Sequence, residues 1–248
     1  MKVRRSKLAL HGLAALAAAV ALFPTAAAAD DWDTCGKQSG DLAIAACSRA
    51  IGSGRYTGQS LARLYTARGV AYQAKGDLDR AMADFNGSMR VDVTYARAYT
   101  TRGIIWYRKG DLDRAMADFD EAIRLDPKGA LHYSNRGIVW RRKGDLDRAI
   151  ADYDEAIRLD PKDDKAYYNR GVAWGLKGDL DRALAEYDEA IRLNPKYAPA
   201  YLARGIAREI KHGLQEALAD FKMYSQLAPS DPKGSEALER VMKALSAR

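Results

Sequence analysis

The sequence has few of the residues that build catalytic and metal sites. Among its 248 residues are three histidines and two cysteines, and His11, His132 and His212 lie far apart. No Ser-His-Asp or Cys-His set has supporting context, and no glycine-rich phosphate loop follows a predicted strand. A lone histidine such as His132 is a poor metal ligand. We therefore expect no enzymatic activity, no metal and no cofactor.

Long apolar runs are also scarce. The sequence contains one, Leu8–Phe23, which follows a basic opening and is broken by Pro24. Ala27-Ala28-Ala29 then supplies the small residues that a signal peptidase needs, with Asp30 as the expected mature start. The alternative is an uncleaved anchor, but the run is short for a span of about 20 residues. We expect residues 1–29 to be a signal peptide, the protein to be periplasmic or secreted, and no stable membrane span after cleavage.

The charge of the chain does not favour nucleic acid. The formal net charge is +7, and the four basic side chains of residues 1–29 leave +3 for the remainder. Nucleic-acid binders normally carry a basic domain or a concentrated basic stripe. We expect no nucleic-acid partner.

The two cysteines, Cys35 and Cys47, lie close together near the expected mature N-terminus. In an exported protein two nearby cysteines most often form a disulfide. Their spacing is too wide for a Cys-x-x-Cys redox motif, and neighbouring histidines for a zinc site are lacking. A structural disulfide is the favoured interpretation over a redox or metal role.

An internal repeat dominates the rest of the sequence. The segment Lys-Gly-Asp-Leu-Asp-Arg-Ala occurs four times at intervals of 34 residues, starting at Lys75, Lys109, Lys143 and Lys177. Glycines at the same interval extend the series to five copies: Gly69, Gly103, Gly137, Gly171 and Gly205. A fixed period of about 20–50 residues is typical of a solenoid.

Each period predicts two helices. In the fourth copy, Tyr167, Gly171 and Trp174 lie on one face of a first helix at i, i+4 and i+7. Asp179 can cap a second helix, because its carboxylate accepts hydrogen bonds from free N–H groups. Pro195 ends that helix, since proline has no N–H group to donate.

The repeat resembles the tetratricopeptide family, whose pattern of aromatics, glycine, alanines and a closing proline recurs here. The third copy reads Tyr133, Arg136, Gly137, Trp140, Ala149, Tyr153, Ala156 and Pro161. The resemblance implies an all-α, right-handed superhelical solenoid of about five repeats, residues 62–229. We expect capping helices in residues 30–61 and 230–248, because a solenoid's ends need covering. No full first helix is expected before the N-terminal cap.

Arginines stand before the repeat glycines, where the family usually has leucine, and an acidic residue follows each one sixteen positions later. An unpaired arginine between packed helices would be costly. We therefore expect structural ion pairs, with a ligand-binding arginine row as the alternative: Arg102 with Asp118, Arg136 with Asp152, and Arg170 with Glu186.

In the family, the first helix of each pair lines the concave groove. Here the groove carries an apolar row with basic and hydrogen-bonding side chains around it, although these arginines could instead form a merely solvated face. The candidate binding residues are Arg63, Arg97, Tyr107, Arg108, Asn135, Arg141, Arg142, Lys165, Tyr168 and Asn169. The resemblance implies a scaffold or adaptor for a protein or peptide partner with acidic and apolar groups. The alternative is a structural subunit that self-associates through its ends or convex face.

Overall fold

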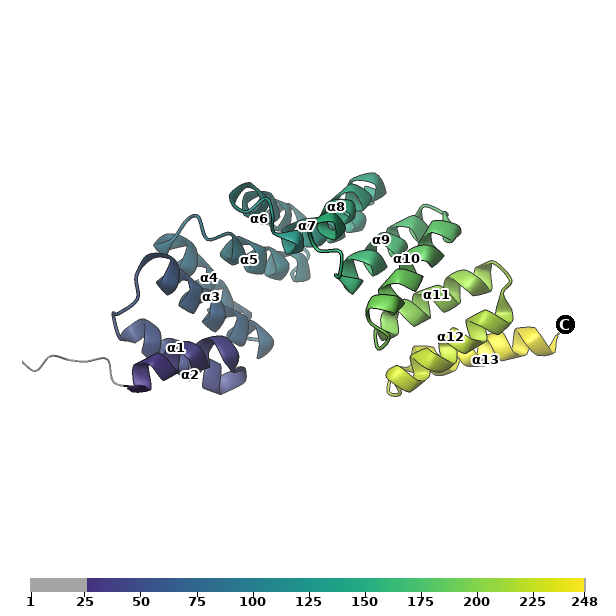
Figure 1. Ribbon diagram of the computed structural model, residues 1–248, viewed down its shortest axis with the longest axis horizontal. Coiled ribbons are helices and arrows are strands. Elements are labelled where there is room, and N and C mark those ends of the chain that lie inside the picture. Colours follow the sequence, from purple (N-terminus) through teal and green to yellow (C-terminus); the bar gives the residue numbers. More distant parts are fainter. Residues whose placement is uncertain (1–25, 248) are drawn as a thin grey trace, which may run out of the picture.

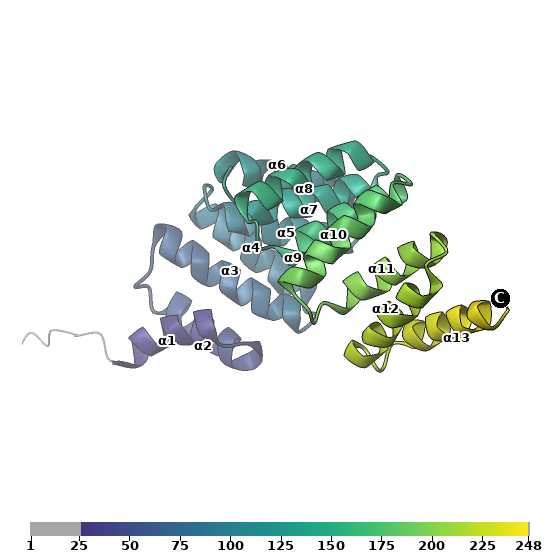
Figure 2. The same cartoon turned by 45° about the vertical axis from the view of Figure 1, so that its right-hand side comes forward.

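The computed structural model describes residues 26–247, which form thirteen helices and no strands. Successive helices form antiparallel hairpins, and each hairpin packs on the next in chain order. Figures 1 and 2 show the resulting arch, with the N-terminal hairpin and the C-terminal helix at opposite ends. The helices are α1 (Ala26–Lys37), α2 (Gly40–Gly52), α3 (Gly58–Ala74), α4 (Leu78–Val91), α5 (Ala96–Arg108), α6 (Leu112–Leu125), α7 (Ala130–Arg142), α8 (Leu146–Leu159), α9 (Asp164–Leu176), α10 (Leu180–Leu193), α11 (Ala198–Ile210), α12 (Leu214–Leu227) and α13 (Pro232–Ser246).

Close approach of the two helices in a hairpin depends on the repeat glycine. Tyr153 of α8 is fully buried, and its ring lies directly against Gly137 of α7. Every copy has this arrangement, with Phe85, Phe119, Tyr187 or Phe221 against its own glycine. The glycine therefore leaves the room into which the second-helix aromatic packs.

The turn inside each hairpin uses a second glycine and an aspartate cap. Gly144 has φ +86°, in the left-handed region that favours glycine. Asp145 then caps α8 by accepting a hydrogen bond from the Arg148 backbone N–H at 3.0 Å. The fifth copy differs, because His212 occupies the left-handed position with φ 63° and the N-cap is Gly213, which has no side chain to accept the bond.

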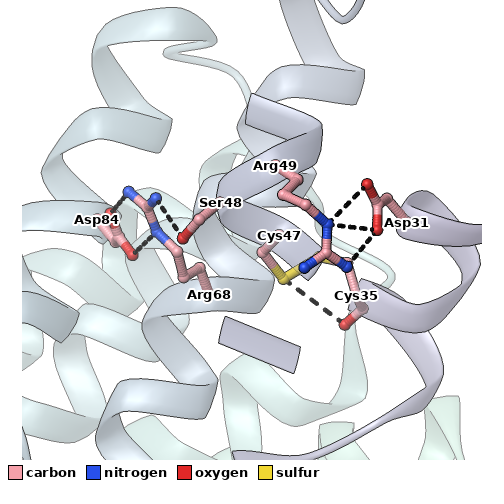
Figure 3. Close-up of a disulfide and its surroundings, with 7 residues drawn as sticks. All are labelled: Asp31, Cys35, Cys47, Ser48, Arg49, Arg68 and Asp84. Atoms are coloured by element: carbon pink, nitrogen blue, oxygen red, sulfur yellow. Dashed lines mark hydrogen bonds and ion pairs between the residues drawn. A yellow bond between two sulfur atoms is a disulfide. The ribbon is translucent and has the colours of Figure 1, made fainter. Parts of the chain in front are cut away.

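The N-terminal end is a complete hairpin. The sequence predicts a second helix without a full first helix before it, whereas α1 supplies that first helix and packs on both α2 and α3. The Cys35–Cys47 disulfide joins α1 to α2 in the core of this hairpin (Figure 3). Periodicity does not reveal α1. Trp32 and Gly36 have the aromatic–glycine spacing of the later first helices, but α1 ends one residue after that glycine and no Lys-Gly-Asp-Leu-Asp-Arg-Ala segment follows it.

The C-terminal helix α13 covers the last hairpin. Ala237 and Val241 are buried against Phe221 of α12, with Leu238 and Leu245 partly buried beside them. This contact covers the apolar face that the fifth repeat would otherwise expose.

Most of the expected signal peptide, residues 1–25, lies outside the described residues; residues 26–29 form the start of α1. Within residues 26–247, every helix is too short or too polar to cross a bilayer.

Candidate functional site

The arginines before the repeat glycines lie between helices. Arg136 on α7 donates from Nε and Nη2 to both carboxylate oxygens of Asp152 on α8, at 2.9 and 2.7 Å. Arg102 contacts Asp118 in the same bidentate way, and Arg170 Nη2 lies 2.8 Å from Glu186. The buried Asp152 carboxylate raises the pKa of Arg136 above its ordinary value. These arginines hold the two helices of a hairpin together.

Each of these arginines also reaches the preceding hairpin, a contact that the sequence analysis missed. Arg136 Nη1 donates to Asp120 of α6 at 2.8 Å, and Arg102 Nη1 donates to Asn86 of α4 at 2.7 Å. The other copies pair Arg68 with Ser48, Arg170 with Asp154 and Arg204 with Asp188 (Figure 3 shows Arg68). For Arg136, Arg170 and Arg204 the sequence signal was a second acidic residue two positions after the first, as in Asp118-Phe119-Asp120. One guanidinium thus links three helices and leaves little capacity for a ligand.

Two threonine hydroxyls of the first helices are buried in the packing between helices. Thr66 donates to Ser88 at 2.9 Å, and Thr100 Oγ1 lies 2.7 Å from Nδ1 of His132. All four side chains are buried. These groups hold helices together and are not available to a partner.

The apolar row along the first helices is open mainly at its ends. Val70 on α3 is 37% exposed and Ile206 on α11 is 41% exposed. Between them, Ile104, Ile138 and Val172 are partly buried against neighbouring side chains. The row therefore contributes to packing in the middle and offers apolar surface toward each end.

Three predicted basic residues lie at the C-terminal ends of α5 and α7. Arg142 donates from Nη1 to the Tyr107 backbone carbonyl at 3.1 Å, and its guanidinium lies 5.0 Å from the Tyr107 ring centroid. Arg108 is exposed and makes no ion pair within residues 26–247. Arg142 also has no carboxylate partner among those residues. The positive charge at this place is therefore not neutralised by the described chain.

Arg141 lies among tyrosines. Burial raises the pKa of Tyr153 to about 12, and the nearby Arg141 guanidinium opposes that shift. Burial likewise raises the pKa of Tyr168, again opposed by Arg141. Arg141 Nε and Tyr153 Oη are buried atoms without a hydrogen-bond partner in the described part of the chain. Tyr168 also packs edge-on against Tyr197, with 5.3 Å between ring centroids.

The remaining predicted residues are dispersed. Asn135 donates to the Leu131 carbonyl of its own helix at 2.7 Å, Asn169 is half-buried, and Lys165 is exposed at the start of α9. Asn135 therefore contributes less to a binding surface than its position predicts.

Arg63 and Arg97 meet at a cleft of about 430 Å³ at the N-terminal end of the array. Its walls come from α1, the start of α2, α3 and the start of α5 with the residue before it, and include Trp32, Val70 and Tyr95. Sequence reasoning missed this cleft, because one wall belongs to α1. No group of three or more potential metal-ligating side chains occurs among residues 26–247.

Family models described as tetratricopeptide repeat match residues 62–92, 96–128, 135–198 and 176–232. The chain belongs to the tetratricopeptide-repeat family, whose members are typically non-enzymatic scaffolds for protein interactions. No curated protein sequence matched the chain in the comparison.

Solved structures share the fold. MamA is 25% identical, with a TM-score of 0.56 over 65% of this chain and 94% of that chain. PilW, a type IV pilus biogenesis factor, is 20% identical, with a TM-score of 0.66 over 76% and 93% of the two chains. YrrB, described as a tetratricopeptide-repeat protein with an unusual peptide-binding site, is 21% identical, with a TM-score of 0.57 over 79% and 99%.

Proposed function

We propose that the protein is an exported adaptor that binds a partner protein through the concave face formed by its first helices. The partner presents an extended segment with acidic and apolar groups. One observation carries this proposal. Arg108, Arg141 and Arg142 lie in the last turns of α5 and α7, Arg142 against Tyr107, and none of the three has a carboxylate partner within residues 26–247.

The second helices differ in this respect. Apart from Arg90 on α4, their exposed arginines are neutralised locally, as Arg124 is by Glu121 at 2.6 Å and Arg158 by Glu155 at 2.5 Å. A surface with unpaired cations attracts an acidic partner and speeds its association, whereas a surface of paired charges does not. The charge pattern therefore favours the first-helix side of the array.

The test compares two triple variants that remove the same charge. Arg108→Ala/Arg141→Ala/Arg142→Ala should lose capture of cross-linked partners from an envelope extract, with unchanged helical circular dichroism. Arg124→Ala/Arg158→Ala/Arg192→Ala removes three paired arginines of the second helices and should retain capture. Equal capture by both variants would dismiss the concave-face proposal.

A second candidate is a subunit that stacks end to end. It is favoured by large apolar side chains exposed at both ends of the array, Leu42 on α2 at 66% and Met242 on α13 at 57%. Light scattering after size-exclusion chromatography separates the two functions: a concentration-dependent array supports stacking, whereas a stable monomer supports the adaptor.

Export is part of the proposal, and it is supported by the leader-like N-terminal sequence and the Cys35–Cys47 disulfide. Fractionation of cells that express the full chain tests it. Recovery of the protein without its leader in the cytoplasmic fraction would contradict export. Recovery of the uncleaved chain in the membrane fraction would also contradict it.

A further inference from the structure

The N-terminal cleft has the size and composition of a ligand site. Its volume of about 430 Å³ falls in the range of about 300–1,000 Å³ typical of such sites. Trp32 and Tyr95 supply aromatic surface, Val70 supplies an exposed aliphatic group, and all three line the same space. A bulky apolar side chain could therefore be buried here.

The free charge of the cleft is positive. Arg63 and Arg97 line it from neighbouring first helices, both are exposed, and neither pairs with a carboxylate within residues 26–247. Three acidic residues of the adjacent hairpin are each held by a basic side chain: Asp31 by Arg49, Asp33 by Lys37 and Asp41 by Lys75 (Figure 3 shows Asp31 and Arg49). The two arginines are therefore left to attract an anionic ligand.

We propose that this cleft anchors an acidic segment of the partner protein by one large apolar side chain. That side chain enters between Trp32 and Val70, and carboxylates on either side of it pair with Arg63 and Arg97. This inference rests on the proposed function. It adds a binding site at the N-terminal end of the array, which the repeats form only together with α1. The basic segment at the start of the chain has the wrong sign of charge for the same position.

The disulfide belongs to this site. Cys35 lines the cleft and is bonded to Cys47, so the covalent link fixes α1, the wall that carries Trp32, against α2. Pre-organising a wall lowers the conformational entropy lost on binding. Cys35→Ser/Cys47→Ser should therefore weaken binding at this cleft.

The test uses three short fluorescein-labelled peptides in anisotropy titrations with the mature protein. One is acidic with a central phenylalanine, one is acidic with a central serine, and one is lysine-rich with a central phenylalanine. The acidic phenylalanine peptide should bind about tenfold more tightly than the other two, as expected when charge and an apolar anchor both contribute. Arg63→Ala/Arg97→Ala should remove that advantage, whereas Arg124→Ala/Arg158→Ala, which removes equal charge elsewhere, should keep it.

Two results would overturn the inference: equal binding of the acidic serine peptide, or an affinity that Arg63→Ala/Arg97→Ala leaves unchanged. Self-association that this variant abolishes would assign the cleft to a second copy of the chain, and would also overturn it. Failure here is distinguishable from failure of the proposed function. Partner capture can still require Arg108, Arg141 and Arg142 when the affinity for the peptides is the same with and without Arg63 and Arg97. In that case the concave-face proposal stands and the proposed site in the N-terminal cleft does not.

Discussion

A Cβ atom added to Gly137 would lie 2.7 Å from Cε1 of Tyr153, closer than carbon atoms approach one another in proteins. Gly137→Ala should therefore force the buried Tyr153 ring to move, and overpacking of this kind costs about 1–3 kcal/mol of unfolding free energy. Chemical denaturation followed by circular dichroism measures the loss.

Gly175→Ala is the matched control. This glycine also lies in a first helix, but an added Cβ would find its nearest neighbour, Tyr187 Oη, at 3.6 Å. Alanine should be neutral there or stabilising by up to about 1 kcal/mol, because it favours helix more than glycine does. Equal losses from both substitutions would show that the ring does not pack on Gly137.

The arginine links between hairpins make a second prediction. Arg136→Met should leave the Asp152 carboxylate, 8% exposed, without its partner, and should cost on the order of 2–3 kcal/mol of unfolding free energy. Arg158→Met removes an exposed arginine that pairs with Glu155, and should change stability by no more than about 0.5 kcal/mol. Similar midpoints for the two variants in urea would rule out a special role for the Arg136 link.

Replacing His212 by glycine should stabilise the array. His212 has φ 63° where four earlier hairpins have glycine, and a left-handed conformation costs a non-glycine residue about 1–2 kcal/mol. His212→Gly should raise the unfolding free energy by about 1 kcal/mol after glycine's own entropic cost is subtracted. Gly178→Ala should lower it by a similar amount, and a thermal midpoint that falls for His212→Gly would contradict the assignment.

Stability should fall below neutral pH because of His132. Burial lowers the pKa of this side chain in the folded state, opposed by Asp126, so the unfolded chain binds a proton more readily. The free energy of unfolding should therefore decrease as pH falls through the unfolded value of about 6.5. His132→Asn should flatten this dependence between pH 7 and 5, whereas His212→Asn should retain it. A wild-type protein equally stable at both pH values would contradict the prediction.

The repeating part of the fold could be predicted because its signals are local and recur every 34 residues. The glycine–aromatic contact of Gly137 and Tyr153 and the cap at Asp145 lie within one period and are repeated in others. The hairpin of α1 and α2 keeps the aromatic–glycine spacing in Trp32 and Gly36, but no aromatic ring packs on Gly36 and the rest of the period is missing. Its first helix therefore became visible only in the structure.

The candidate site was harder to predict, because its groups interact across periods. The hydroxyl of Thr100 on α5 contacts His132 of the next hairpin, a contact that no spacing within one period predicts. The association of Arg141 with Tyr153 and Tyr168 likewise depends on how α7, α8 and α9 stack. Spacing along the chain predicts on which face of its helix a residue lies. It does not predict which neighbouring helix packs on that face.

Arginine-specific labelling with phenylglyoxal tests the central claim most directly. Modification rates are compared by mass spectrometry with and without the captured partner. Our account predicts that the partner slows modification of Arg108 and Arg142 on the first helices and leaves Arg124 and Arg158 on the second helices unchanged. Protection of Arg124 and Arg158 with Arg108 and Arg142 still fully reactive would contradict it.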